Sequence, residues 1–243
     1  MKKKYILTLL LMFFFIGCQP SEQAVQTTGT QTREANPTPT ITPEPTLTST
    51  STPTPIPSST PDIRIIKTDI QDFLLQQMDL PPEGRYYLPA PSWSSPHHNY
   101  EIIQDVGQEF GNQYINEIGR MDGWYAHYVR GRSNNSLPSE IHNSVVMLSG
   151  IEGAKLYMEK YVRGFNLAAG YVEVKTDLKI GDSVVMFEKR DNGEMNYVIE
   201  FSYRNFIQRV VGIGIKTDAD KKLIVDIAYL LLNRLQNAPV SSP

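Results

Sequence analysis

The stretch Ser183–Ile215, SVVMFEKRDNGEMNYVIEFSYRNFIQRVVGIGI, decides the expected fold. It contains three apolar runs of strand length, at about 183–189, 196–203 and 206–215. The first two runs are separated by Asp191-Asn192-Gly193-Glu194 and the last two by Arg204-Asn205. Both connections have residues that are typical of β-hairpin turns. The stretch therefore predicts three consecutive antiparallel strands.

Two further strands and four helices are expected around these three strands. The strands are expected at 124–129 and 141–148, and apolar residues recur at helical spacing at about 64–78, 101–118, 150–162 and 219–236. The last helix opens with Thr217-Asp218-Ala219-Asp220, which has the pattern of a capping box. Residues 81–100 are rich in proline and are expected to form a loop. The prediction is an α+β fold, an antiparallel sheet of about five strands with helices packed on it.

Residues 19–62 are expected to form a disordered stalk in front of this domain. Threonine and proline dominate from Asn36 to Pro61, in repeats such as TPT, TPEPT and TPTPIP. Proline removes a backbone donor, and a segment with so little to bury cannot offset the entropy of ordering. In polyproline II, residues 36–61 would reach about 80 Å. We interpret the stalk as an inert spacer, followed by a single domain at 63–243.

The first seventeen residues have the pattern of a signal peptide. Lys2, Lys3 and Lys4 precede an apolar run from Tyr5 to Gly17. As a helix this run would span about 20 Å, which is short of the roughly 30 Å hydrocarbon core of a bilayer. A cleavable signal peptide is therefore predicted rather than a permanent transmembrane helix.

The run ends in Phe15-Ile16-Gly17-Cys18, which resembles the lipobox of bacterial lipoproteins. The resemblance implies diacylglycerol on the sulfur of Cys18, cleavage before that residue and, usually, a third acyl chain on the new amino group. Two or three chains would hold the protein firmly, since each buried methylene contributes about 0.8 kcal/mol. An ordinary secretory signal with an incidental cysteine is the alternative. The expected location is the extracytoplasmic face of a bacterial membrane, with the membrane as a partner through Cys18.

Composition excludes several classes of function. Cys18 is the only cysteine, so the chain can form no internal disulfide and no cysteine-based metal cluster. The net charge is −3, and cleavage of the signal peptide would leave 20 basic against 26 acidic side chains, a net charge of −6. This acidity argues against a nucleic acid partner.

Glycine and aspartate motifs in the domain are given structural interpretations. Gly212-Ile213-Gly214 has no third glycine at the spacing of a nucleotide turn, so close packing of a helix over the strand is expected. Asp218 and Asp220 are interpreted as helix-capping residues rather than calcium ligands. Gly181-Asp182-Ser183 lacks the pattern of a nucleophile elbow, and Asp182 is expected in the turn that enters a strand.

The four histidines do not show a metal-binding spacing. His97 and His98 are adjacent and cannot easily face one ion, whereas His127 and His142 lie on neighbouring expected strands and could meet across the sheet. We interpret the second pair as a hydrogen-bonded polar pair rather than a zinc site. The sequence thus predicts no catalytic residue, no metal and no cofactor.

Aromatic side chains in residues 81–100 are the candidate binding residues. Tyr86, Tyr87, Trp93 and Tyr100 would be exposed on the expected loop, where such rings stack on sugars or anchor protein partners. The expected ligand is therefore a protein or a glycan. The alternative is that these rings plug the loop onto the core.

Three short segments and the order of elements resemble small extracytoplasmic domains of the PknH-type kinase sensor and PsbP-like lipoprotein families. The segments are Met78-Asp79-Leu80-Pro81, Gly119-Arg120-Met121-Asp122-Gly123-Trp124 and Ile180-Gly181-Asp182-Ser183. The resemblance implies a noncatalytic α+β sandwich used for sensing or assembly. The leading hypothesis is a membrane-anchored extracytoplasmic lipoprotein with a noncatalytic ligand- or partner-binding domain. The alternatives are an extracytoplasmic hydrolase using His127, His142 and Asp182, or an accessory subunit of a membrane complex.

Overall fold

The computed structural model describes residues 62–80, 87–131, 137–191 and 193–242. Their centre is a seven-stranded antiparallel sheet with the strand order β2-β3-β4-β8-β7-β6-β5. The strands are β2 (Tyr87–Pro96), β3 (Arg120–Arg130), β4 (Glu140–Leu148), β5 (Val172–Val174), β6 (Ser183–Asp191), β7 (Glu194–Tyr203) and β8 (Phe206–Ile215). Two short strands, β1 (Ile65–Ile66) and β9 (Val240–Ser241), pair separately.

The three strands predicted over 183–215 are confirmed as β6, β7 and β8. The α+β class is also confirmed, but the expected number of about five strands is wrong, because β2 and β5 were missed. Both lie at edges of the sheet. An edge strand tolerates proline because one side of its backbone needs no ladder partner. The prolines that predicted a loop over 81–100 are therefore compatible with β2.

Helix α5 (Asp218–Asn237) covers one face of the main sheet. Its predicted capping box is present, since the Thr217 hydroxyl accepts a hydrogen bond from the Asp220 amide and the Asp220 carboxylate accepts one from the Thr217 amide. The predicted close packing over Gly212 is confirmed as well. A Cβ at that position would lie 2.7 Å from Cδ1 of Ile224 on α5.

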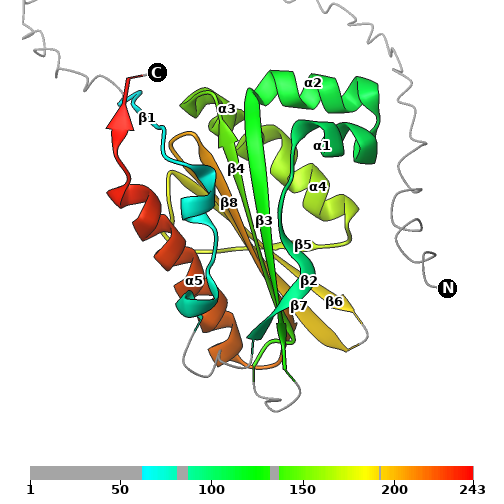
Figure 1. Ribbon diagram of the computed structural model, residues 1–243. Helices are drawn as coiled ribbons and strands as arrows, with labels where there is room; N and C mark the ends of the chain where they lie inside the picture. Colours follow the sequence, from blue (N-terminus) through cyan, green and yellow to red (C-terminus); the bar gives the residue numbers. More distant parts are fainter. Residues whose placement is uncertain (1–61, 81–86, 132–136, 192, 243) are drawn as a thin grey trace, which may run out of the picture. The chain divides into compact units, whose positions relative to one another are not determined.

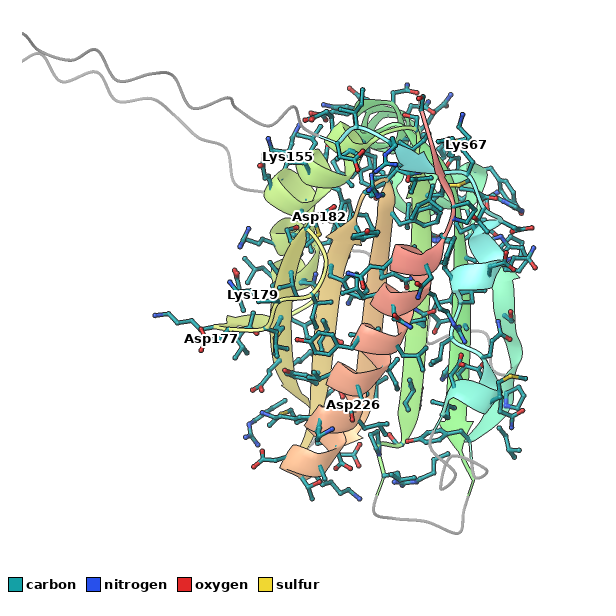
Figure 2. The ribbon with its side chains drawn as sticks, turned by 90° about the vertical axis from the view of Figure 1, so that its left-hand side faces the viewer. Lys67, Lys155, Asp177, Lys179, Asp182 and Asp226 are labelled. Carbon is teal, nitrogen blue, oxygen red and sulfur yellow. The ribbon has the colours of Figure 1, made fainter. Side chains whose placement is uncertain are left out.

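Residues 62–80 lie beside α5 on the same face (Figure 2) but do not form the α-helix predicted over 64–78. After β1 they form only two 3-10 turns, η1 (Ile70–Phe73) and η2 (Gln77–Asp79). Seven apolar side chains of the segment are nevertheless buried: Ile65, Ile66, Ile70, Phe73, Leu74, Leu75 and Leu80. The apolar pattern therefore predicted correctly that the segment is buried, but the α-helix that it predicted is wrong.

Buried polar side chains of the sheet replace the missing helical hydrogen bonds of this segment. Asn205 accepts a hydrogen bond from the Ile66 amide at 2.8 Å. Gln208 donates one to the Phe73 carbonyl at 2.9 Å. Buried backbone groups must be paired, and here the partners come from more than 130 residues away along the chain.

Helices cover part of the opposite face, where α1 (Asn99–Val106) and α2 (Gln108–Ile118) gather at one end of the sheet (Figure 1). The single helix expected over 101–118 is broken at Gly107, whose φ of 90° belongs to the left-handed half of the map. The helix expected over 150–162 continues to residue 168 through α3 (Ile151–Leu156), a π-helical turn (Tyr157–Tyr161) and α4 (Val162–Ala168).

The signal peptide, Cys18 and residues 19–61 of the expected stalk lie outside the described residues, so these remain predictions. Asp62, the last residue of the expected stalk, is described and forms an ion pair with Arg204. Within the part of the chain that the structure describes, no helix is both long enough and apolar enough to cross a membrane.

Candidate functional site

A cleft lies on the helical face of the sheet, over β3, β4 and β8. It consists of three adjoining hollows of about 210, 230 and 340 Å³, and Ser144 on β4 lines all three. Ile102 and Val106 of α1 and Phe165 of α4 form part of the apolar wall of one hollow. The largest hollow alone, and the three together, fall in the size range of small-molecule sites, whereas the two smaller hollows lie below it singly.

A row of polar side chains crosses the sheet beneath this cleft. Five residues are direct neighbours from strand to strand: Ser95 (β2), Tyr125 (β3), Ser144 (β4), Arg209 (β8) and Glu200 (β7). Directly opposite residues point to the same face of a sheet. Successive side chains of a strand point to opposite faces of the sheet. On β3, Trp124 and Ala126 pack into the core beneath α5, so Tyr125 between them points to the opposite face, toward the cleft.

The row ends in a buried ion pair. Glu200 is 1% exposed, and its Oε2 accepts a hydrogen bond from Nη1 of Arg209 at 2.7 Å. Asn166 donates to the same oxygen, and the hydroxyl of Tyr157 donates to the other. Burial, reinforced by the charge of Glu200, holds the pKa of Tyr157 well above its ordinary value, so this hydroxyl remains a donor. The negative charge beneath the cleft is therefore matched by Arg209.

Next to this row, three side chains meet at one end of the cleft. Nε2 of His127 lies 2.7 Å and Nε2 of His142 lies 2.9 Å from the same oxygen of Glu140. The two histidines are directly opposite in the β3–β4 register, with ring centroids 4.0 Å apart. The prediction that they meet across the sheet is confirmed. Nδ1 of His142 forms a further hydrogen bond, of 2.8 Å, with the Tyr125 hydroxyl.

The charge states at this cluster follow from burial and from the carboxylate. Burial lowers the pKa of His142 below its ordinary value, and the hydrogen bond to Glu140 opposes that effect without cancelling it. Burial raises the pKa of Glu140, but the hydrogen bonds from His142 and His127 outweigh it, so the pKa of this carboxyl is lowered. The cluster thus contains a carboxylate beside a neutral His142 at neutral pH.

The sequence missed Glu140. The predicted strand began at Ile141, whereas β4 begins one residue earlier. Strand alternation would then have placed Glu140 on the same face as His142.

Of the four aromatic residues predicted to bind, the structure describes the side chains of Tyr87 and Tyr100. Tyr87 is fully buried, and its hydroxyl donates to the Pro138 carbonyl at 2.6 Å, so this residue belongs to the core and corrects the expectation of an exposed ring. Tyr86 and the side chain of Trp93 lie outside the described residues. Tyr100 is exposed on α1, with its ring 5.6 Å from that of His98.

The structure does not bring Asp182 to the histidines. His142 belongs to a row that continues through Val211 and Val198 to Phe187 on β6, three strands away. Asp182 precedes Phe187 by five residues and, in the turn before β6, accepts a hydrogen bond from the Arg204 amide at 2.6 Å. This placement confirms the turn interpretation and leaves the proposed hydrolase residues divided between two sites.

A larger hollow of about 610 Å³ lies between α3 and the strands β6 and β7. Figure 2 shows Lys155 and Asp182 at this end of the domain, whereas Asp177 and Lys179 lie further down on the loop between β5 and β6. Three of the six charged side chains that line this hollow are already in ion pairs: Asp62 binds Arg204, and Arg163 binds Glu173 outside the hollow. We therefore take the cleft, with its polar row, as the candidate functional site.

Comparisons with known proteins include a weak structural similarity. No family model matches the chain, and no curated protein matches it. Among solved structures, it is similar to the extracellular domain of PknH from Mycobacterium tuberculosis, with 12% identity and a TM-score of 0.41. The match covers 68% of this chain and 95% of that chain. No residue or activity is transferred from it.

Proposed function

We propose that the chain is a lipid-anchored extracytoplasmic lipoprotein whose folded domain binds a small polar ligand in the cleft without catalysing a reaction. The polar row from Ser95 to Glu200 is the observation that carries this proposal. A concave site with apolar walls and a few fixed polar groups is the usual form of a small-molecule site. The short apolar run before Cys18, followed by the threonine- and proline-rich stalk, supports the anchor.

The ligand that fits this cleft best is uncharged and rich in hydroxyl groups, such as a mono- or disaccharide. Arg209 carries a charge that Glu200 already neutralises. Burial lowers the pKa of both His97 and His142, so that each lines the cleft as a neutral donor and acceptor. Ser144 and Tyr125 add hydroxyls, and the faces of aromatic rings in the cleft can pack against the apolar face of a sugar.

The test titrates the full chain with a panel of neutral mono- and disaccharides and measures binding by isothermal titration calorimetry. Ser144→Leu fills the point where the three hollows meet and should abolish binding. Ser183→Leu is the matched control, because Ser183 lines only the larger hollow. Absence of binding by every sugar would reject this ligand class, and binding that survives Ser144→Leu would reject the cleft.

The anchor has its own test. Cells expressing the full chain are labelled with a fatty acid analogue and fractionated. The parental protein should carry the label and sediment with membranes, and Cys18→Ser should lose the label and leave the membrane fraction. A Cys18→Ser protein that is still labelled would contradict lipidation of this thiol.

A further inference from the structure

We infer that His127, Glu140 and His142 form a binding site for one divalent transition metal ion, with Zn²⁺ as the ion that fits best. One ligand atom from each of the three side chains can be chosen so that all three lie within 4.8 Å of one another. The inference concerns these three residues alone and does not depend on the ligand proposed for the cleft.

The backbone fixes the three side chains in the arrangement that a metal requires. His127 and His142 are directly opposite on adjacent antiparallel strands, so their Cβ atoms are held about 5 Å apart. Glu140 is two residues from His142 on the same face of β4. Both residues of β4 are also paired with β8 on the other side of the strand. The ligands therefore stand on regular strands in the interior of the sheet rather than on loops.

The donor set selects the class of metal. Two imidazole nitrogens and one carboxylate oxygen are the three protein ligands of many zinc sites, with a further position left open. Calcium and magnesium prefer oxygen ligands only, so this mixed set disfavours them. Imidazole donors suit zinc, copper and nickel, and among these ions Zn²⁺ readily takes a tetrahedral site of this composition.

The distances require only a small adjustment for an ion to enter. The two Nε2 atoms lie 2.7 and 2.9 Å from the Glu140 oxygen that they share. Around a tetrahedral Zn²⁺ with bonds of 2.0–2.1 Å, neighbouring ligand atoms stand about 3.3 Å apart. Opening these two contacts by about half an ångström, through rotation of side chains, therefore brings both to the spacing of neighbouring zinc ligands.

A second side chain orients one of the ligands. The Tyr125 hydroxyl lies 2.8 Å from Nδ1 of His142, the ring nitrogen that does not face Glu140. Metal-binding histidines usually hydrogen-bond through their other ring nitrogen, which fixes the tautomer and the direction of the ring. Tyr125 thus keeps Nε2 of His142 pointing at the site.

The site is accessible from solution and borders the cleft. The side chains of His127 and His142 are each 21% exposed, and that of Glu140 is 34% exposed. His142 also lines the hollow that contains Ser144 and Arg209. An ion held there would have its open coordination positions available to water or to a group of a bound molecule.

The inference is tested by titrating the untagged full chain with Zn²⁺, in a Cys18→Ser background so that the lone thiol cannot bind metal. Calorimetry should show one ion per chain with micromolar or tighter affinity, and Co²⁺ should give the visible absorption of a tetrahedral site. His127→Ala and His142→Ala should each weaken binding by about a hundredfold, and Tyr125→Phe by about tenfold. His98→Ala is the matched control and should bind as the parent does, because Nδ1 of His98 is paired with Asp122 away from the cluster.

Glu140→Gln provides a second test in case an alanine variant fails to fold. It preserves the shape of the side chain and removes the anionic ligand, so unfolding in the presence of EDTA should be unchanged while the rise in Tm caused by Zn²⁺ should disappear. Failure of the parent to bind Zn²⁺ would overturn the inference. Binding at undiminished affinity in both histidine variants would overturn it equally, because the ion would then be held elsewhere.

Discussion

Replacing Arg209 by methionine should destabilise the domain by about 3 kcal/mol, because it removes the cation from a buried carboxylate. Breaking a buried ion pair by deleting one partner costs about 3–5 kcal/mol. Here Glu200 is 1% exposed, but the Arg209 side chain retains 27% exposure, so solvent screening places the expected cost at the lower end of that range.

The magnitude also follows from the hydrogen bonds that would be lost. Arg209 donates to Glu200 at 2.7 Å and to the amide oxygen of Asn166 at 2.8 Å. A hydrogen bond to a charged group contributes about 1.5–3 kcal/mol and a neutral one about 1 kcal/mol. After the substitution, Glu200 would retain only neutral donors, from Tyr157 and Asn166. The two ways of counting agree.

Combining Arg209→Met with Glu200→Gln should recover most of this loss, since a buried pair replaced as a whole by neutral groups is nearly isoenergetic. Urea unfolding followed by circular dichroism measures the four free energies of the cycle. Arg163→Met is the control, because its bidentate partner Glu173 is exposed and the pair contributes at most about 1 kcal/mol. The reasoning is refuted if Arg209→Met costs no more than Arg163→Met, or if the double variant is no more stable than Arg209→Met alone.

Two further predictions concern the packing of a glycine and a buried pair of hydrogen bonds. Gly212→Ala should destabilise the domain by about 1–3 kcal/mol, because the added Cβ would lie 2.7 Å from Cδ1 of Ile224. Gly164→Ala is the control: its Cβ meets nothing within 4 Å, so it should be neutral or stabilising. Thermal unfolding measures both. Asn205→Ala should lower the free energy of unfolding by about 2 kcal/mol or more, because the amide and the carbonyl of Ile66 both bind Asn205. Hydrogen exchange at the Ile66 amide should become faster, and unchanged exchange there would contradict this prediction.

The parts of the fold that the sequence predicted are those specified by neighbouring residues. The connection between β6 and β7 needs a positive φ, which Gly193 supplies at 83°. The start of α5 needs a side chain to accept its free amides, which Thr217 supplies. In both cases the residue that determines the conformation lies inside the element or next to it.

The parts that the sequence missed are those determined by distant partners. Residues 64–78 have an apolar pattern that fits a helix, yet Asn205 and Gln208 satisfy the segment's backbone in a non-helical conformation. Nothing within the segment shows that these partners exist. Tyr87 was expected on a loop for the same reason, because its place in the core follows from pairing with Arg130.

The sequence predicted one part of the candidate site, the histidine pair, and missed the other, the polar row, for a geometric reason. Alternation along β3 and β4 was enough to place His127 and His142 together, because the two strands are neighbours in sequence and in the sheet. The polar row also requires β8 to pair with β4, a contact between residues that are 65 positions apart at Ser144 and Arg209. A shift of that register by one residue would turn Arg209 toward α5 and remove the cation from beneath the cleft. The polar row on this face therefore depends on a register that no local pattern encodes.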